Sequence, residues 1–501
     1  MRTNRSHFHT CGSGRRGEFH GPAGVGKPAI RDDQGVERAS SWRPHPEGAG
    51  RNVDRRCFLG GAGLVGLAAV GGIAGAVPLP APPSEPKNGA DDKLAVAVFQ
   101  FGARGDGRKD NTDAFQKALD RAHAQGGGIV AVPAGRYLLK GHLVLPANTT
   151  LQGVFRSPPA TVMKSGTVLL PLEGRGNADG PPFLSSHGTF NAGIRGLGIY
   201  YPEQDDGSVD PAPYPWTIES SGNDFSVQDV ALTNTYQGIN LAGSARHYVA
   251  RVYGQPLLTG IYVDQCYDVG RIENIHFYPF WSGPPSRVFK WVGAHGVGIR
   301  IARSDWQYVL NTFVLGYNIG YHFVQSPDGP CNGNFVGLGA DASGRAAVVV
   351  EQSQPPGLLI TNGEFVGDQR PESEGLIVEA NNEGPVRLQN CSFWGASNRI
   401  GTLRGRGEVS LIGCTFMSWD KNRRGEPAFL LDGAPATISN CSFRRWRGVG
   451  WNECVAAKIT PRCASAVIAG NTTIGRNFIV QHPSGISPGR FQIAMNVAAG
   501  Q

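Results

Sequence analysis

The chain of 501 residues contains 71 Gly and 35 Pro, and 40% of its residues are hydrophobic. This length and apolar content allow a large core, which excludes general disorder, a collagen-like repeat and a small disulfide scaffold. Frequent Gly and Pro also exclude an all-helical bundle, because both residues interrupt helices. The formal net charge is +7, but the first 76 residues hold 11 Lys/Arg against 6 Asp/Glu, which leaves 36 against 34 in the rest. This balance gives no electrostatic reason to expect a nucleic-acid partner.

The N-terminal part of the chain has the features of an export signal. Arg55-Arg56 precedes an uncharged stretch of Gly, Ala, Leu and Val that ends at Ala76, and a Pro-rich segment follows. A membrane anchor would need about 20 predominantly apolar residues, and this stretch is diluted by Gly. The pattern resembles a twin-arginine signal. We therefore expect residues 1–76 to be a leader that is cleaved after export to the periplasm or the medium, without membrane contact afterwards, and residues 77–92 to be a linker.

Residues 93–160 are predicted to form an N-terminal cap and the first coils of the fold. Apolar residues recur at helical spacing between Asn111 and Ala122, and Gly126 to Gly128 end the pattern. We expect this helix to cover the open end of a sheet structure, whose strand edges would otherwise be unpaired. The apolar stripe of the helix consists of Ala114, Phe115, Ala118, Leu119 and Ala122.

From about residue 194, a sequence pattern recurs in which apolar and small residues surround an Asn-like position. Several gaps between these positions are close to 22 residues, the length of a coil with three short strands and their turns. The repeat predicts an all-β fold, a parallel β-helix over residues 161–486, followed by a C-terminal tail at 487–501. The predicted corner positions are Gly196, Asp229, Arg251, Asn274, Asn311, Asn332, Asn362, Asn390, Gly413, Asn440 and Asn471.

A second sequence pattern lies between these corners and predicts one strand in each coil. It alternates strictly, as in Gly260-Ile261-Tyr262-Val263-Asp264. Successive side chains of a strand point to opposite faces. We therefore expect Ile261 and Val263 to be buried inside the coil, and Tyr262 and Asp264 to be exposed outside it.

Three segments near the start of the predicted fold carry a family resemblance. Residues 101–107, 110–115 and 127–137 resemble the opening of the pectate lyase superfamily, in the branch with rhamnogalacturonase-like, epimerase-like and family 28-related glycoside hydrolase proteins. The resemblance implies a right-handed parallel β-helix with an N-terminal capping helix that acts on acidic or neutral polysaccharides. It does not imply one reaction, because function depends on the site and not on the fold.

The signatures of two specific activities are missing. Family 28 polygalacturonases share a set of Asn-Thr-Asp, Asp-Asp, Gly-His-Gly and Arg-Ile-Lys motifs in their middle coils. Here the Asn-Thr-Asp lies at 111–113, in the predicted cap helix, and the set as a whole is absent. The mannuronan epimerase motif Tyr-Gly-Phe-Asp-Pro-His is absent too. The sequence therefore supports neither activity.

In β-helix enzymes of this superfamily, the substrate commonly lies along the outer face of the first strand column, beside variable loops. The longest insertions of this chain are predicted at that corner, at 200–216 and 278–297. Aromatic rings beside carboxylates suit sugars, which stack on rings and need polar partners. The alternative is that the loops fold back and bury their rings. The candidate substrate-binding residues of the loops are Tyr201, Asp205, Asp206, Trp216, Trp281 and Trp291.

The remaining candidates lie on the predicted outward strand positions, in successive coils. Solvent-facing polar residues are also the default for a half-exposed sheet, so the argument depends on their concentration beside the two long loops. The candidate catalytic residues are Asp264, Arg300, His322 and Glu351, and the candidate substrate-binding residues beside them are Tyr262 and Asn240.

Hydrolysis and elimination both remain open as the reaction. Hydrolysis needs two carboxyl groups about 5 to 9.5 Å apart. Asp264 and Glu351 are three coils apart, so Asp264 would need a loop carboxylate as partner. Elimination from a uronate needs a positive charge and a base, which Arg300 and His322 supply, optionally with Ca²⁺ at Asp264. No ligand spacing in the sequence defines a metal site.

A different class of protein is also compatible with this sequence. Phage-type tail spikes and surface adhesins use an exposed polar row on a β-helix to bind glycans without cleaving them. The export leader favours a secreted enzyme. In either case the expected partner is a polysaccharide or oligosaccharide.

Overall fold

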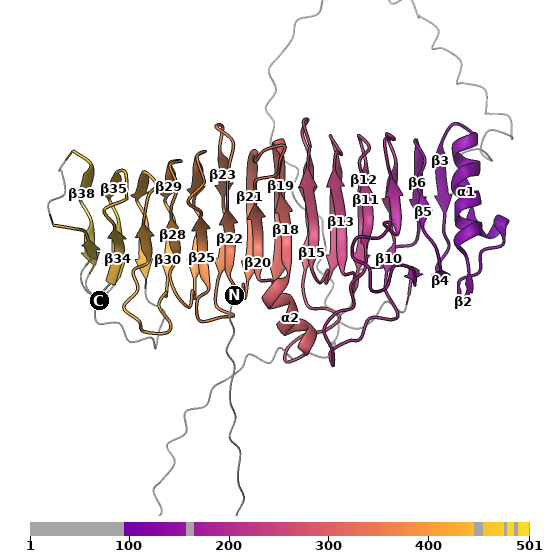
Figure 1. Ribbon diagram of the computed structural model, residues 1–501, viewed down its shortest axis with the longest axis horizontal. Helices are drawn as coiled ribbons and strands as arrows, with labels where there is room; N and C mark the ends of the chain where they lie inside the picture. The colour runs from indigo at the N-terminus through magenta and orange to yellow at the C-terminus, as the bar shows by residue number, and fades with distance from the viewer. Residues whose placement is uncertain (1–94, 157–164, 445–453, 475–477, 485–488, 500–501) are drawn as a thin grey trace, which may run out of the picture. The chain divides into compact units, whose positions relative to one another are not determined.

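The structure, a computed structural model, describes residues 95–156, 165–444, 454–474, 478–484 and 489–499. The predicted leader, 1–76, and linker, 77–92, lie outside these residues, and so does part of the predicted tail. From residue 95 onward, short strands stack coil upon coil into a parallel β-helix (Figure 1). The fold class predicted from the repeat is confirmed. Each coil contributes one strand to each of three faces.

Face 1 is a 13-stranded parallel sheet. It follows the long loops and contains the predicted alternating strands. Its strands are β5 (Leu143–Val144), β8 (Leu184–Ser186), β11 (Trp216–Ser220), β13 (Gln237–Ala242), β15 (Thr259–Asp264), β18 (Val297–Ile301), β20 (Ile319–Phe323), β22 (Ala346–Val350), β25 (Glu374–Val378), β28 (Gly401–Leu403), β31 (Phe429–Leu431), β34 (Cys454–Ile459) and β37 (Phe478–Gln481).

Face 2 follows face 1 in each coil and is the first of two columns in a 26-stranded sheet. Its strands are β1 (Ala95–Ala97), β3 (Gly128–Ala131), β6 (Thr149–Gln152), β9 (Gly193–Arg195), β12 (Ser226–Leu232), β14 (Tyr248–Gly254), β16 (Arg271–Glu273), β19 (Ser304–Leu315), β21 (Cys331–Asp341), β23 (Leu358–Thr361), β26 (Val386–Gln389), β29 (Val409–Ile412), β32 (Ala436–Ser439), β35 (Ala466–Ala469) and β38 (Phe491–Ala494).

Face 3 is the second column of this sheet. The strands β12, β14, β19 and β21 continue from face 2 into face 3, because each pairs with both columns. The other strands of face 3 are β2 (Asp106–Asp110), β4 (Gly135–Leu139), β7 (Thr167–Pro171), β10 (Gly198–Ile199), β17 (His276–Phe277), β24 (Glu364–Val366), β27 (Ser392–Trp394), β30 (Thr415–Met417), β33 (Ser442–Arg444), β36 (Thr472–Ile474) and β39 (Val497–Ala499).

A single residue in left-handed conformation turns the chain from face 2 to face 3. Non-glycine residues at this corner have φ between 49° and 55°. Asn tolerates this conformation because its short amide can form local hydrogen bonds. In one pair of coils the corner amides also stack, since Asn390 Nδ2 donates to Asn362 Oδ1 over 2.8 Å. The non-glycine corner residues that match the prediction are Asp229, Arg251, Asn274, Asn311, Asn362, Asn390 and Asn440.

Two of the predicted corner positions are wrong. The corner after Asn311 is Gly337 and not Asn332, and a later corner is Gly470 and not Asn471. Glycine adopts positive φ without steric cost, so no Asn is needed at either place. Asn471 is instead buried, where its Oδ1 accepts the backbone N–H of Cys441.

The interior of the coils is apolar, as the alternation predicts. Ile261 and Val263 are fully buried, and a column of phenylalanines continues the core along later coils. Phe365 and Phe393 lie 4.8 Å apart between ring centroids, and Phe416 follows at 5.9 Å from Phe393. Equivalent positions of successive coils lie above one another, and therefore each phenylalanine of the column packs on the phenylalanine of the next coil.

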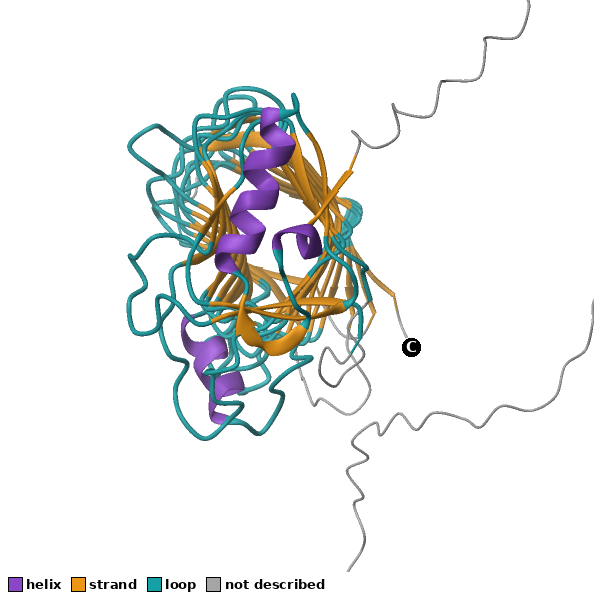
Figure 2. Cartoon of the chain, turned by 90° about the vertical axis from the view of Figure 1, so that its right-hand side faces the viewer, coloured by secondary structure: helices purple, strands orange, loops and turns teal. Residues whose placement is uncertain are grey.

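Within the described residues, two α-helices and one short 3-10 helix (Val98–Phe101) accompany the strands. Helix α1 (Thr112–Ala124) lies across the end of the coils (Figure 2) and buries the five predicted stripe residues. Helix α2 (Arg287–His295) lies inside the second long insertion, where the sequence predicted a loop. Its start is capped by Ser286, whose Oγ accepts the Phe289 N–H. No helix in the described parts of the chain is long and apolar enough to cross a membrane.

Candidate functional site

A row of polar side chains runs along the outer surface of face 1. Glu219, Asn240, Tyr262, Arg300 and His322 occupy equivalent positions in five successive strands, from β11 to β20. Adjacent members are about 4.8 Å apart along the stack, because that is the spacing of paired strands. The structure therefore brings four predicted site residues into one row and adds Glu219, whose Oε2 accepts Asn240 Nδ2–H over 2.8 Å.

Arg300 and Tyr262 form the centre of this row. Arg300 is exposed, as predicted, and its Cζ lies 5.6 Å from the centroid of the Tyr262 ring. Trp216 stacks on the Tyr262 ring, with centroids 6.3 Å apart and an interplanar angle of 19°. Trp216 is thus a strand residue that extends the row. These contacts hold a cation above an aromatic surface, the arrangement of a cation–π pair.

His322 ends the row and is paired with Glu351. The Nε2 of His322 lies 2.8 Å from Glu351 Oε1, and only 12% of the His322 side chain is exposed. Burial lowers the pKa of His322 to about 4; Arg300 acts in the same direction and the Glu351 carboxylate opposes it. The imidazole is therefore neutral at pH 7. Because a carboxylate only accepts hydrogen bonds, Nε2 carries the proton and Nδ1 has the free lone pair.

Asp264 is buried, with 6% of its surface exposed, so the prediction that it is exposed is wrong. Its Oδ2 accepts the Tyr262 hydroxyl over 2.9 Å, and its Oδ1 accepts the Ser326 hydroxyl over 2.9 Å and the Arg303 N–H over 3.0 Å. A further bond comes from the Gln265 N–H. Arg303 and Ser326 belong to turns of the following coils, and these turns cover the end of β15. Asp264 therefore orders Tyr262 and two turns.

The environment of Asp264 does not fit a calcium ion. Ca²⁺ is held by six to eight oxygen ligands, whereas both Asp264 oxygens accept hydrogen bonds from N–H or O–H donors. No group of three or more His, Cys, Asp or Glu side chains that could hold a metal occurs among the described residues.

Beyond His322, the equivalent positions of the row become apolar. Val349 and Ile377 continue the register of His322 along face 1. Both are buried, in an outer cluster with Ile319 and Ala346. The continuous row of polar side chains on face 1 therefore ends at His322 and Glu351, which limits the candidate site to the coils from β11 to β22.

The two long insertions contact each other beside face 1. Arg287, at the start of α2, forms an ion pair with Asp210 of the first insertion, with 2.7 Å between Nε and Oδ1. The Ser282 hydroxyl donates to the carbonyl oxygen of Asp206. The predicted placement of these insertions at the entrance to face 1 is correct, because they precede β11 and β18.

The loop residues predicted to bind substrate differ in their exposure to solvent. Tyr201 is fully buried, so it cannot contact a substrate; its hydroxyl bonds Thr217 and its ring packs on Tyr214. Asp205 is exposed, but its carboxylate accepts the Gly207 and Ser208 N–H groups of its own turn. These bonds lower the pKa of Asp205 to about 2. The sequence could not distinguish these roles, because both follow from how the loop folds back.

The two tryptophans of the second insertion are half-buried against the core. Trp291, on α2, packs on Tyr236 with centroids 5.8 Å apart. The backbone N–H of Trp281 donates a hydrogen bond to Gln255 Oε1 over 3.1 Å. Asp206 of the first insertion remains exposed. The alternative that the loops bury their rings is therefore correct for Tyr201 and partly correct for these tryptophans.

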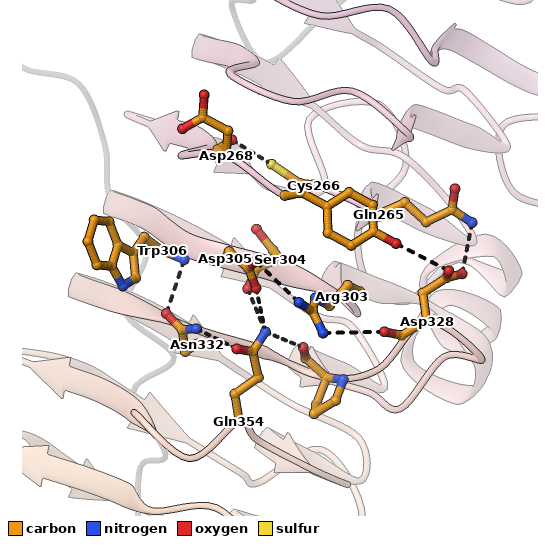
Figure 3. A network of polar contacts seen from close by, with 12 residues as sticks. Gln265, Cys266, Asp268, Arg303, Ser304, Asp305, Trp306, Asp328, Asn332 and Gln354 are labelled. Carbon is orange, nitrogen blue, oxygen red and sulfur yellow. Dashed lines mark hydrogen bonds and ion pairs between the residues drawn. The ribbon is translucent and has the colours of Figure 1, made fainter.

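A polar network at the corner between face 1 and face 2 was not predicted (Figure 3). Arg303, whose N–H binds Asp264, extends its guanidinium to Asp305, with 3.2 Å between Nη2 and Oδ2. Trp306 follows directly and is 62% exposed. The sequence did contain a pattern that could have indicated this network: an aromatic residue stands next to an Asp in both Tyr267-Asp268 and Asp305-Trp306.

This stacked architecture and its polar outer row define the class of protein. The chain is a parallel β-helix protein, and its residues 95–247 match the family described as rhamnogalacturonase A/epimerase, pectate lyase-like.

Among curated proteins, alginate lyase 7 of Azotobacter vinelandii is 54% identical over 44 residues, which are 9% of this chain and 5% of that protein. The chain thus spans a small part of the length of the curated relatives it matches.

Two solved structures illustrate the likeness of the fold. The A-module of the mannuronan C-5 epimerase AlgE6 from Azotobacter vinelandii is 16% identical, with a TM-score of 0.45, and the match covers 81% of this chain and 99% of the module. The pre-mature gene product 12 of bacteriophage phi29 is 13% identical, with a TM-score of 0.51, and the match covers 76% of this chain and 53% of that one. At this identity the likeness concerns the fold alone.

Proposed function

We propose that the chain is a polysaccharide lyase that removes the proton next to the carboxylate of a uronate residue. The observation that carries the proposal is the pairing of Arg300 with His322 in adjacent strands of face 1. It places the backbones of a cationic residue and a histidine about 4.8 Å apart along the stack. The short match to a protein named as an alginate lyase supports the same substrate class.

Arg300 and His322 have complementary roles in this reaction. The Arg300 guanidinium binds the substrate carboxylate and neutralises it, which lowers the cost of negative charge developing at C5. His322 then accepts the C5 proton on Nδ1, since its Nε2–H is bound to Glu351. The Glu351 carboxylate stabilises the imidazolium that forms.

Tyr262 supplies the proton that the leaving oxygen needs. Burial and the Asp264 carboxylate raise the pKa of Tyr262, so its hydroxyl is protonated at neutral pH. As the C4–O bond breaks and the C4–C5 double bond forms, the Tyr262 O–H turns from Asp264 Oδ2 to the leaving oxygen and gives its proton to that oxygen. Arg300, above the ring, offsets the negative charge left on Tyr262. Asp264 is a positioning residue, because it holds the Tyr262 hydroxyl without reaching the surface.

Hydrolysis has weaker support from the same residues. It would need a protonated carboxyl group and a second carboxylate facing the same bond. Asp264 is buried among donors, and Glu351 is bound to His322. The carboxylate of Asp205, one of the loop candidates, accepts hydrogen bonds from its own turn.

Incubation of the protein with alginate, pectate and glucuronan, with cellulose and mannan as neutral controls, tests the proposal. Ultraviolet absorbance of unsaturated uronate ends is followed together with reducing ends. We expect both to rise on a uronate polymer, and Arg300→Gln and His322→Gln to lower turnover at least about 100-fold. Lys458→Gln is the matched control, because Lys458 is exposed in the same row of face 1, several coils away.

Other outcomes of this experiment would overturn the lyase assignment. Reducing ends without unsaturation would indicate hydrolysis. Exchange of the C5 hydrogen with deuterated solvent, without chain cleavage, would indicate an epimerase. Binding of a polymer without any turnover would indicate a glycan-binding protein of the adhesin or tail type.

We also propose export through the twin-arginine pathway, from the sequence of residues 1–76. Replacing Arg55 and Arg56 by Lys should keep the protein in the cytoplasm, because the pathway reads the arginine pair. Cell fractionation with an antibody to the chain measures this. Unchanged export of the double variant would refute the assignment.

A further inference from the structure

A surface hollow of about 410 Å³ lies at the corner between face 1 and face 2. It is separate from the Arg300–His322 row, although Asp264 connects the two by accepting both the Tyr262 hydroxyl and the Arg303 N–H. Figure 3 shows most of the residues around it. The hollow is lined by Tyr267, Asp268, Val269, Arg303, Asp305, Trp306, Asn332 and Gln354.

Two large aromatic side chains of this hollow face the solvent. Trp306 is 62% exposed and Tyr267 is 56% exposed. Trp306 has φ +56°, a left-handed conformation that is strained for a bulky residue. It lies in a β-bulge, where the register between β19 and β21 shifts between Ser304 and Gln307. The strained backbone presents the indole outward, which packing of the core does not require.

The polar groups around Trp306 are held in place by one another. Asn332 Oδ1 accepts the backbone N–H of Trp306 over 3.0 Å, and Asn332 Nδ2 donates to Gln354 Oε1 over 2.7 Å. Gln354 Nε2 donates in turn to Asp305 Oδ1 over 2.8 Å. These amides and the carboxylate are therefore oriented before any ligand binds, which reduces the entropic cost of binding.

Arg303 completes the hollow. Its Cζ lies 5.3 Å from the centroid of the Tyr267 ring, and its buried Nε has no hydrogen-bond partner. The guanidinium is balanced by Asp305, and the second carboxylate of the lining, Asp268, is paired with Arg246 outside it. With one cation and two carboxylates, the lining does not favour an anionic ligand.

We propose that this hollow binds a neutral pyranose residue of a glycan. The flat C–H face of the sugar would stack on the exposed rings of Trp306 and Tyr267, and its hydroxyls would bond the amides of Asn332 and Gln354 and the Asp305 carboxylate. The site does not depend on the proposed lyase reaction. If both hold, the natural ligand contains neutral sugars as well as uronates.

Binding of neutral hexasaccharides of glucose, mannose, galactose and xylose to the whole protein, measured by isothermal titration calorimetry, tests the site. We expect at least one of them to bind, and Trp306→Ala to weaken its affinity at least tenfold, with partial recovery in Trp306→Phe. Trp394→Ala is the matched control, since Trp394 is 40% exposed on face 3 and should leave affinity unchanged. Circular dichroism of each variant checks folding.

Three results would overturn the proposal. These are no binding of any neutral hexasaccharide, equal affinity in the parent and Trp306→Ala proteins, and preferential binding of hexagalacturonate or hexamannuronate through this hollow. His322→Gln separates the two sites: it should bind the neutral hexasaccharide like the parent, whatever its effect on turnover.

Discussion

The Nε2–H of His322 donates to the Glu351 carboxylate across face 1, with 2.8 Å between Nε2 and Oε1. The two residues are 29 positions apart in the chain and meet because β20 and β22 are paired. The bond determines which imidazole nitrogen carries the proton. It also places the charge that would stabilise an imidazolium on the side away from Arg300.

Removal of Arg300 should raise the pKa of His322. Burial is the main cause that lowers that pKa to about 4, and the Arg300 cation contributes in the same direction because it disfavours the imidazolium. In Arg300→Gln, titration of the His322 ring protons by NMR should therefore shift to higher pH, while Lys458→Gln should titrate like the parent. Identical titration of the parent and Arg300→Gln proteins would mean that the two side chains do not interact.

Stability should fall in acid because of His247. This residue is fully buried, and its Nδ1–H donates to the Ser244 carbonyl oxygen over 2.8 Å. Burial lowers its pKa to about 4, from an ordinary value near 6.5. Between these values the unfolded chain binds the proton and the folded chain does not, so stability is present above pH 6.5 and is lost as pH falls toward 4.

The expected loss from His247 is about 3 kcal/mol. Urea denaturation of the parent at pH 7.5 and 4.5 measures it, and His247→Gln should show a smaller difference between these pH values. His482→Gln, at an exposed position, should keep the parental difference. An unchanged difference in His247→Gln would assign the acid sensitivity to other groups.

Ion pairs on the later coils should differ strongly in their contribution to stability. The Asp432 side chain is 7% exposed and accepts Arg462 Nε–H over 2.9 Å and the Thr460 hydroxyl over 2.7 Å. Asp432→Ala should lower the free energy of unfolding by about 1–3 kcal/mol, because the buried carboxylate and its hydrogen bonds to Thr460 and Arg462 are lost together.

The exposed pair Arg387–Glu408, 3.4 Å apart, provides the comparison. Glu408→Ala should change the free energy of unfolding by less than about 1 kcal/mol, since water screens exposed pairs. Thermal unfolding of both variants under one buffer condition ranks them. Equal effects would show that burial does not decide the contribution of these carboxylates.

The corner at Asn390 should tolerate Gly and reject a β-branched residue. Asn390 has φ +52° and donates from Nδ2 to Asn362 Oδ1. Asn390→Val should destabilise the protein by about 1–2 kcal/mol, because the left-handed conformation crowds its Cβ. Asn390→Gly should cost less, since it loses only the amide bond and some backbone entropy. Greater destabilisation by Gly would contradict the importance of the corner conformation.

The sequence by itself determined the repeat, the strand alternation and the capping helix. These are local properties. Inward and outward positions follow from the two-residue period of a strand, as at Ile261 and Val263, and the corner follows from residues that tolerate positive φ, such as Asn390. The row of Tyr262, Arg300 and His322 was also predictable, because stacking of successive coils places equivalent positions side by side.

Only the tertiary structure decided which outward residues are accessible. Asp264 has an outward position but is buried by Ser326, which is 62 residues later in the chain. Tyr201 is in a surface insertion, yet Thr217 and Tyr214 enclose it. Trp306 is exposed because a bulge against β21 turns the backbone there. In each case, accessibility depends on turns contributed by other coils, and no local pattern in the sequence encodes how those turns fold over a strand end.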